Sequence, residues 1–436
     1  MPATRLSARS ALKEALAADL EEASKHTEDI LRPLDDERLT TQYDALMSPP
    51  LWDYAHIGVF EDLWLVHALS GAPVDERLMR LYNPIDTPRV ARGRAPLMNR
   101  RESAAYRADV RQRALALLEE VDLEADDPLL KDGFVYDLVI QHEQQHDETI
   151  LQTVQLTPGA YLTSLPVLPA GAPANAGMVF VAAGTYPIGA DAVAPYDNER
   201  LQHWVRIPAF RIDRFPVTNA QYLAFMDDGG YARSELWSRD GWDWRGTFDI
   251  VAPEYWNATS KGWTTLRAGV QVPVDERVPV CHVSWFEAEA YSRWAGKRLP
   301  TEFEWEVAAA WDPEERRARR YPWGEAAPEQ DRANLDQQLF SPAPVGAYPA
   351  GASALGCEQM LGDVWEWTSS DFRPYPGFRP HPYPEYSVPF FGDAFKVLRG
   401  ASWATRPRVA RNTFRNWDSR LKRQIFAGFR CAEDAT

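Results

Sequence analysis

Two histidines four residues apart are the first candidates for chemistry in this 436-residue chain. His142 and His146, in the segment HEQQH, continue the apolar helical spacing of residues 135–139. Both imidazoles are therefore expected on the buried face of one helix, on successive turns. Two imidazoles at positions i and i+4 can bind one metal ion. The alternative is a pair of core histidines, each satisfied by a separate hydrogen bond.

A third ligand must come from another helix. His56 and His67 lie on an earlier helix about 16 Å apart along its axis, so one ion cannot bind both. His56 shares a stripe with Trp52 and Val59, whereas His67 suits the end of that helix, where a histidine complements the helix dipole. We predict a metal site of His56, His142 and His146. The other histidines are expected to be structural or exposed: His26, His203, His282 and His381.

These residue types do not decide the metal. Three neutral imidazoles can hold zinc or iron, and the usual oxygen-activating ferrous site has two histidines and a carboxylate. HEQQH also matches the H-E-x-x-H signature of zinc proteases, in which Glu143 would be the general base. The residues themselves indicate only a divalent transition metal with open positions.

The elements that carry these histidines follow from hydrophobic spacing. Residues 1–160 show four segments with the apolar spacing of a helix. Leu12, Leu16, Leu20 and Ala23 mark the first segment, and Trp52, Val59, Leu63 and Val66 mark the second. The third covers residues 103–120, and the fourth is marked by Val135, Leu138, Val139 and Ile150. We predict a four-helix bundle. Residues 83–101, rich in Pro and Arg, are expected to form a long loop.

After residue 160 the composition of the chain and the pattern of its expected elements change. Residues 161–177 are rich in Pro, Ala and Gly and are predicted to be a linker. Residues 178–436 combine short strand-like pieces with long irregular joins, which indicates a loop-rich α+β domain. Helices are expected at 285–294 and after LPTEFEWEVAAAW, where Thr301 and Glu304 fit a capping box.

Composition narrows the function classes. The net charge is −16 and no long basic run exists, which argues against nucleic acid and anionic membranes as partners. No apolar run approaches the ~20 residues that span a bilayer, and the N-terminus lacks a signal core. The 3 cysteines are widely spaced, so no disulfide framework is expected. We expect a cytoplasmic monomer that acts on small molecules.

The second half carries an ordered set of motifs: MVFVAAGTYPIGA, PVTNAQYLAFMDDGGY, PVCHVSWFEAEAYSRWAGKRLPTEFEWEVAAA, YPWGE, LGDVWEWTSSDF, VLRGASW and AGFRCA. Together they resemble the formylglycine-generating-enzyme, or sulfatase-modifying, domain with its lectin-like fold, although its paired active-site cysteines are missing. The first half resembles the DinB-like bundle. This combination is similar to the sulfoxide synthases of the ergothioneine pathway. That resemblance implies an enzyme that uses Fe(II) and O₂ to join hercynine (Nα-trimethylhistidine) to γ-glutamylcysteine as a sulfoxide.

The resemblance also implies roles for individual residues. His56, His142 and His146 match the iron ligands, and the active site is expected between the two domains. Gln145, Asn416 and Trp417 match hercynine-binding residues, and Trp417 could cover the trimethylammonium by a cation–π contact. Tyr383 is expected to donate a proton and Tyr386 to position substrate. Arg89, Arg92 and Asp418 match the clamp for the thiol substrate.

Three other functions stay open from the sequence. One is a selenoneine synthase of the same fold, which would use a selenosugar in place of the thiol. The second is the zinc metalloprotease indicated by HEQQH. The third is a non-catalytic module that binds through the lectin-like domain.

Overall fold

The computed structural model describes residues 2–171, 177–191 and 196–435. It divides the chain into two compact units, Met1–Tyr161 and Leu162–Thr436. The described part of the predicted linker, residues 161–171 and 177, contains neither helix nor strand, and its remaining residues 172–176 lie outside the described part. No helix among the described residues is both long enough and apolar enough to cross a membrane.

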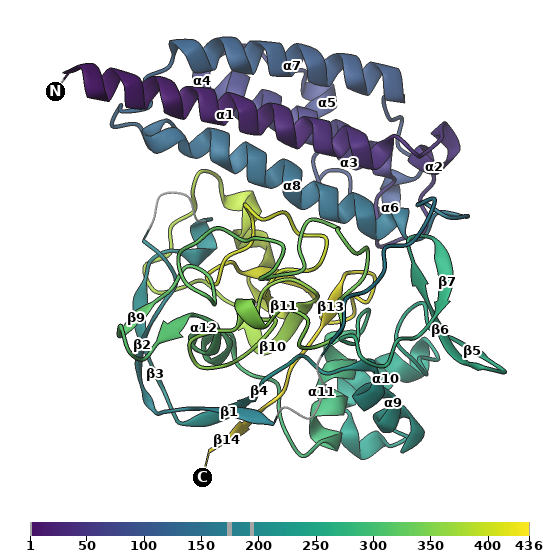
Figure 1. Cartoon of the computed structure of the whole chain (residues 1–436). Helices are drawn as coiled ribbons and strands as arrows, with labels where there is room; N and C mark the ends of the chain where they lie inside the picture. Colours follow the sequence, from purple (N-terminus) through teal and green to yellow (C-terminus); the bar gives the residue numbers. More distant parts are fainter. Residues whose placement is uncertain (1, 172–176, 192–195, 436) are drawn as a thin grey trace. The chain divides into compact units, whose positions relative to one another are not determined.

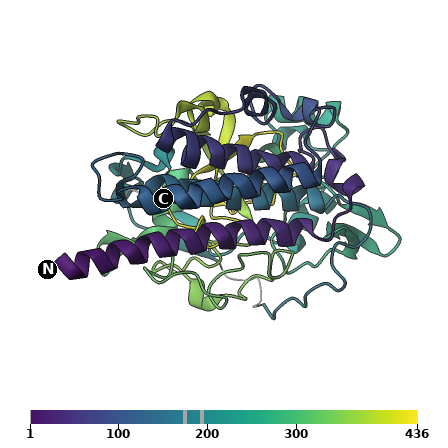
Figure 2. The same cartoon turned by 90° about the horizontal axis from the view of Figure 1, so that it is seen from above.

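The first unit is helical, as predicted (Figure 1). Its elements are α1 (Pro2–Leu31), α2 (Asp36–Thr40), α3 (Pro50–Glu61), the π-helix η1 (Asp62–His67), α4 (Ala68–Ser70), α5 (Glu76–Leu81), α6 (Arg89–Arg92), α7 (Arg100–Glu120), the 3₁₀ turn η2 (Lys131–Gly133) and α8 (Phe134–Val154). The long helices pack as α1 on α7 and α8, and α3 on α7 and α8. Seen from above, α1 and α7 run side by side (Figure 2). The four-helix prediction is confirmed.

Local sequence explains where these helices begin. Pro50 starts α3, because its fixed φ suits the first helical position. Asn99 and Glu102 form a capping box at the start of α7. Gly133 precedes α8 with φ of 75°, and a Cβ there would lie 2.6 Å from Leu16 Cδ1, so this position requires glycine.

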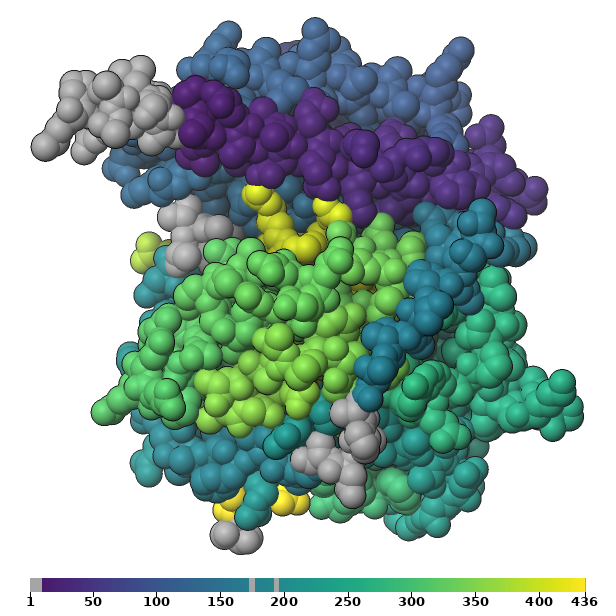
Figure 3. Space-filling model, in the orientation of Figure 1, coloured from purple at the N-terminus to yellow at the C-terminus, as the bar shows by residue number. Residues whose placement is uncertain are grey.

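The predicted stripes face the bundle core with two exceptions. Leu16, Leu20 and Ala23 are buried, as are the predicted residues of α8, whereas Leu12 and Leu63 are only partly buried. The opposite side of α1, with Glu14, Glu21 and Lys25, is exposed along the surface (Figure 3). The predicted loop 83–101 is interrupted by the single helical turn α6, and α7 already begins at Arg100.

The second unit has short strands and long connections. Its sheets are β1 (Met178–Val181), β4 (Phe210–Asp213) and β14 (Ala432–Asp434); β2 (Gly184–Ile188) and β3 (His203–Ile207); β5 (Asn257–Thr259), β6 (Gly262–Arg267) and β7 (Val270–Pro273); β8 (Trp311–Asp312) and β9 (Arg317–Ala318); and β10 (Trp365–Phe372), β11 (Gly392–Arg399), β12 (Asn416–Ser419) and β13 (Ala427–Gly428). The last sheet has the order β12-β11-β10-β13, so β12 is an edge strand.

Helices and 3₁₀ turns fill the joins of this unit. They are α9 (Asn219–Asp227), α10 (Arg239–Thr247), α11 (Trp285–Trp294), α12 (Glu302–Ala310) and the turns η3 (Asp197–Glu199), η4 (Ser234–Leu236), η5 (Pro349–Gly351), η6 (Pro384–Tyr386) and η7 (Val388–Phe390). The predicted helix 285–294 and the Thr301–Glu304 capping box are both confirmed. The mixed α+β prediction therefore holds.

Buried arginine–carboxylate pairs hold the loops of the second unit together. Arg415 Nε donates to Glu302 Oε2 at 2.7 Å, and Arg430 Nε donates to Glu366 Oε2 at 2.7 Å. Paired, hydrogen-bonded charges of this kind can replace the contacts that long regular elements would otherwise supply. Because Arg415 directly precedes β12, its anchoring also places Asn416–Ser419.

Candidate metal centre

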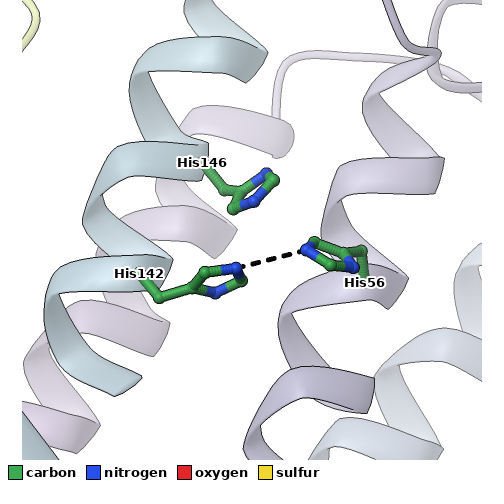
Figure 4. Close-up of side chains that lie close together, drawn as sticks. All are labelled: His56, His142 and His146. Carbon is green, nitrogen blue, oxygen red and sulfur yellow. Dashed lines mark hydrogen bonds between the residues drawn. The ribbon is translucent and has the colours of Figure 1, made fainter. Parts of the chain in front are cut away.

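Three imidazoles from two helices meet inside the first unit. α3 supplies His56 and α8 supplies His142 and His146, and one nitrogen from each ring lies within 4.8 Å of the others. Figure 4 shows the three rings converging, with His56 Nε2 and His142 Nε2 3.2 Å apart. Among the residues that the structure describes, this is the only such group of His, Cys, Asp or Glu. The prediction that these three histidines lie together agrees with this geometry.

The other ring nitrogens determine which atoms can bind a metal. His56 Nδ1 lies 2.6 Å from the backbone oxygen of Tyr82, and His146 Nδ1 lies 2.9 Å from Asp53 Oδ1. Each Nδ1–H therefore donates to an oxygen, which leaves the lone pair on Nε2. Metal-binding histidines typically have this arrangement.

The donor set fits a divalent transition metal. Metal–imidazole bonds are about 2.1 Å long, so two ligands on one ion lie roughly 3 Å apart, close to the separation of the two Nε2 atoms. Burial lowers the pKa of both His56 and His142 well below the ordinary value, and the neighbouring His146 lowers both further. Neutral imidazoles are the form that binds a metal.

Aromatic rings cover two of the ligands. Trp52 stacks on His56 with ring centroids 4.8 Å apart and an interplanar angle of 14°, and Phe60 stacks on His142 at 3.6 Å and 9°. Trp52, His56 and Phe60 follow one another at four-residue intervals along α3, so a single face of this helix supplies a ligand and both stacked rings.

Glu143 belongs to a different site. It is buried, and its carboxylate accepts hydrogen bonds from Arg107 at 2.5 Å and from Thr27 at 2.8 Å, with Arg111 at 3.3 Å. Burial would raise its pKa, but the two guanidinium charges and these hydrogen bonds outweigh burial and lower it. A carboxylate held in this way by α1 and α7 is not available as the base of a zinc protease.

The predicted substrate residues of the first unit differ in exposure. Arg89 begins α6 and is exposed, whereas Gln145 on α8 is partly buried. Arg92 is buried, with its guanidinium carbon 3.4 Å from the centroid of the Trp52 ring. Arg92 Nε donates to Thr87 O and its Nη1 donates to Ser48 Oγ. Arg92 therefore packs on the ring that covers His56.

Three of the predicted residues in the second unit form one aromatic cluster. The rings of Tyr383 and Tyr386 have centroids 6.4 Å apart, and Tyr386 meets Trp417 edge-on at 5.3 Å. Trp417 also stacks on Phe372 at 4.2 Å. Burial raises the pKa of Tyr383 well above its ordinary value, and the neighbouring Tyr386, Asp197 and Glu385 raise it further, so this phenol keeps its proton at neutral pH.

Two polar residues of β12 flank Trp417 in the sequence. Asn416 and Asp418 alternate with Trp417 along the strand and project from its other face. Asp418 Oδ1 accepts from Ser419 N at 2.7 Å, and its Oδ2 lies 3.9 Å from Lys422 Nζ. Both side chains are partly exposed on an edge strand.

Comparison with known proteins identifies both units. Residues 19–150 match the DinB superfamily, and residues 167–435 match the Sulfatase-modifying factor enzyme 1-like domain. Hercynine oxygenase of Mycolicibacterium smegmatis is 49% identical over 440 residues, which cover 97% of this chain and 99% of that protein. The hercynine oxygenases of Mycolicibacterium thermoresistibile and Mycobacterium tuberculosis are 49% and 48% identical, covering 92% and 97% of this chain and 90% and 99% of their own.

The chain belongs to the hercynine oxygenase family. It is therefore an oxidoreductase of the oxygenase type, as the resemblance implied. Members of the hercynine oxygenase family share both halves of this chain, because the matched regions extend over almost its whole length.

Sequence reasoning missed the groups that surround the three candidate metal ligands. Asp53 and the backbone oxygen of Tyr82 orient two imidazoles, and Phe60 covers the third. No motif marks them, since Asp53 and His146 meet only when α3 packs on α8. The remaining histidines behave as expected where contacts define them: His67 Nδ1 donates to Ala72 O near the end of α4, and His282 is buried.

Proposed function

We propose that this protein is an Fe(II)- and O₂-dependent sulfoxide synthase that joins hercynine to γ-glutamylcysteine. The observation that carries the proposal is the convergence of three imidazoles, those of His56 and His142 buried and that of His146 partly buried, in a chain whose relatives are hercynine oxygenases. A backbone carbonyl orients His56 and a carboxylate orients His146. In the reaction, one C–H and one S–H bond break, C–S and S–O bonds form, and the second oxygen atom of O₂ leaves as water.

Each group of residues would have a separate task. His56, His142 and His146 would hold ferrous iron, which supplies the electrons that activate dioxygen. Trp52 and Phe60 keep water away from two of the ligands by covering their rings. Gln145, Asn416 and Trp417 would bind hercynine, with the indole of Trp417 against the trimethylammonium group. Tyr386 would position substrate beside it.

Tyr383 would deliver the proton that reduction of oxygen requires. The raised pKa means that the phenol carries its proton at neutral pH and is a weaker acid than a free tyrosine, so the case for this role rests on its place in the cluster with Tyr386 and Trp417. Tyr383→Phe should keep metal and both substrates bound but divert oxygen toward oxidation of the thiol alone. Product analysis by mass spectrometry tests this, and an unchanged ratio of sulfoxide to oxidised thiol would remove Tyr383 from the mechanism.

The identity of the thiol substrate is inferred from the charged residues proposed to bind it. γ-Glutamylcysteine has two carboxylates and one amine, which match two arginines, Arg89 and Arg92, and one aspartate, Asp418. A neutral selenosugar offers none of these partners, and cysteine engages only part of the set. We therefore expect kcat/KM to favour γ-glutamylcysteine over cysteine by at least ~tenfold, equivalent to about 1.4 kcal/mol.

The decisive experiment combines metal analysis with oxygen consumption. The full chain, loaded anaerobically with Fe²⁺ or Zn²⁺, is given hercynine with γ-glutamylcysteine, cysteine or a selenosugar, and separately a peptide library. Sulfoxide formed only with iron and preferentially from γ-glutamylcysteine supports the proposal. Efficient turnover only with the selenosugar, or peptide hydrolysis by the zinc form, would overturn it.

Two histidine variants serve as a matched pair in this assay. His56→Ala should abolish iron retention and turnover, since its ring is one of the three converging ligands. His67→Ala should leave both intact, because its Nδ1 donates only to a local backbone oxygen, that of Ala72. Normal activity in His56→Ala would contradict the assigned ligand set.

A further inference from the structure

Asp53 is a buried carboxylate with an unusual environment. Its side chain is 1% exposed, and Oδ1 accepts from His146 Nδ1 at 2.9 Å. Oδ2 is buried and has no hydrogen-bond partner among the described residues. Nor does any arginine or lysine in the described part of the chain form an ion pair with Asp53. Two other buried carboxylates in this unit, Glu61 and Glu143, both pair with guanidinium groups.

An ionised carboxylate in such a position is costly unless a positive charge compensates it. Arg92 interacts electrostatically with Asp53, but its guanidinium donates hydrogen bonds to Thr87 and Ser48 and not to this carboxylate. One nitrogen of His146 also lies within 4.8 Å of nitrogens of His56 and His142, where a metal ion could bind. A divalent cation at that site would balance Asp53 through the imidazole.

We propose that Asp53 is a positioning residue for the metal: it holds the tautomer and orientation of His146 and offsets the charge of the bound ion. The inference rests on the proposed metal site and concerns a residue that is not itself a ligand. It also follows from the helix register, because Asp53 lies one turn before His56 on α3, so this helix supplies one ligand and orients another ligand on α8.

Two substitutions separate orientation from charge. In Asp53→Asn the amide oxygen can still accept from His146 Nδ1–H, so the ring stays oriented while the negative charge is lost. In Asp53→Ala both contributions are lost. Loss of such an outer group typically weakens metal binding 10–100-fold. We expect a loss of that size in Asp53→Ala and a smaller loss in Asp53→Asn.

The test uses Co²⁺ as a spectroscopic probe on the full chain. Its dissociation constant is measured by competition with a chelator, and the visible absorption bands report the ligand geometry. Asp62→Asn is the matched control, since Asp62 is also a buried aspartate of the same continuous helix but pairs with Tyr106 Oη at 2.8 Å and Arg113 at 3.1 Å. This control should leave the Co²⁺ dissociation constant and spectrum unchanged, even if it lowers the melting temperature.

Melting temperatures measured without and with Co²⁺ distinguish an effect on metal binding from an effect on the stability of the metal-free protein. If Asp53 acts on the metal, Co²⁺ raises the melting temperature less in the variants than in the wild type, and least in Asp53→Ala. A dissociation constant within threefold of the wild type in both Asp53 variants, with the Co²⁺ spectrum unchanged, would overturn the inference. Failure of the wild type to bind Co²⁺ or Fe²⁺ at all would instead refute the proposed metal site.

Discussion

Adjacent residues on α8 serve separate tasks. His142 faces His56, whereas Glu143 is one position further along and meets Arg107 and Arg111 on α7. A rotation of about 100° per residue is enough to send neighbouring side chains to different partners. The same five residues that match a protease signature therefore contribute two metal-ligand candidates and one buried carboxylate that pairs with two arginines.

This arrangement predicts how Glu143→Gln behaves. The substitution leaves buried guanidinium groups without part of their counter-charge, so the free energy of unfolding should fall by about 3 kcal/mol. Oxygen-dependent turnover per folded molecule should persist. Because the folded pKa of Glu143 is lowered, its stabilisation is present above the ordinary value of 4.5 and is lost as pH falls through the folded pKa. Urea denaturation at pH 7 measures the effect, with exposed Glu124→Gln as control.

Substitutions of the two arginines of α6 should have different effects on stability. Arg92→Ala removes a buried cation from the face of Trp52 and should lower the melting temperature of the first unit, in addition to any effect on thiol binding. Arg89→Ala, at an exposed position, should raise KM for γ-glutamylcysteine without changing the melting temperature. Equal melting temperatures for both variants would contradict the difference that their burial indicates.

At the scale of elements, α3 is the helix on which the candidate metal centre depends. It carries one ligand, two stacked rings and Asp53, and it packs against both α7 and α8. Its approach to α7 is close at Gly58, where a Cβ would lie 2.7 Å from Arg107 Cγ and 3.4 Å from the Tyr106 ring. Glycine at this position lets the two helices pack with Arg107 in place.

Gly58→Ala should therefore destabilise the bundle by about 1–3 kcal/mol, because the added methyl displaces a buried side chain. Gly246 is the matched control: it lies in α10, and a Cβ there meets nothing within 4 Å. Gly246→Ala should be neutral or stabilising by up to about 1 kcal/mol through helix propensity. Chemical denaturation of both variants measures the difference, and an equally stable Gly58→Ala would refute the close packing.

The segment that carries Tyr383 and Tyr386 is held by η3. Asp197 accepts from Ser387 Oγ at 2.5 Å and from the backbone nitrogen of His381 at 3.3 Å, and Tyr196 stacks on Tyr386 at 4.4 Å. These contacts involve residues on both sides of the two tyrosines. Asp197 is buried, and burial raises its pKa from 3.8 to about 6 despite these hydrogen bonds.

A pH dependence of stability follows for the second unit. A raised folded pKa means that the folded state binds the proton more tightly than the unfolded chain. The contribution of Asp197 is therefore fully present below pH 3.8 and is lost as pH rises through about 6. In Asp197→Asn, stability between pH 4 and 6.5 should fall less with rising pH than in the wild type. Urea midpoints measured across this range test the assignment, and parallel profiles would contradict it.

On the scale of the whole molecule, the candidate metal ligands and their orienting partners all belong to the first unit, whereas Tyr383, Asn416, Trp417 and Asp418 belong to the second. A fragment of residues 1–161 should therefore fold as a helical bundle and bind one Co²⁺ without supporting turnover. At a free metal concentration of 100 times the dissociation constant, binding should stabilise the fragment by about 2.7 kcal/mol. A helical fragment that binds no metal would show that the ligand set is incomplete.

The sequence by itself determined the helical and α+β halves, the boundaries of α11 and the capping box of α12, because these depend on periodicity and on contacts between near neighbours. It also determined that His142 and His146 share a face, since a four-residue spacing requires this in any helix. His56 was predicted from its stripe, which is a weaker argument, and the packing of α3 on α8 brings it to them.

Only the tertiary structure decided what surrounds these residues. Asp53 contacts His146, Phe60 contacts His142, and Glu143 contacts Arg107. The two residues of each pair are at least 36 positions apart in the sequence, and no local pattern records such pairs. Whether a carboxylate in HEQQH is a base or an ion-pair partner depends on which helix lies against it. That is a property of packing, where burial and charge compensation act over distance in the sequence.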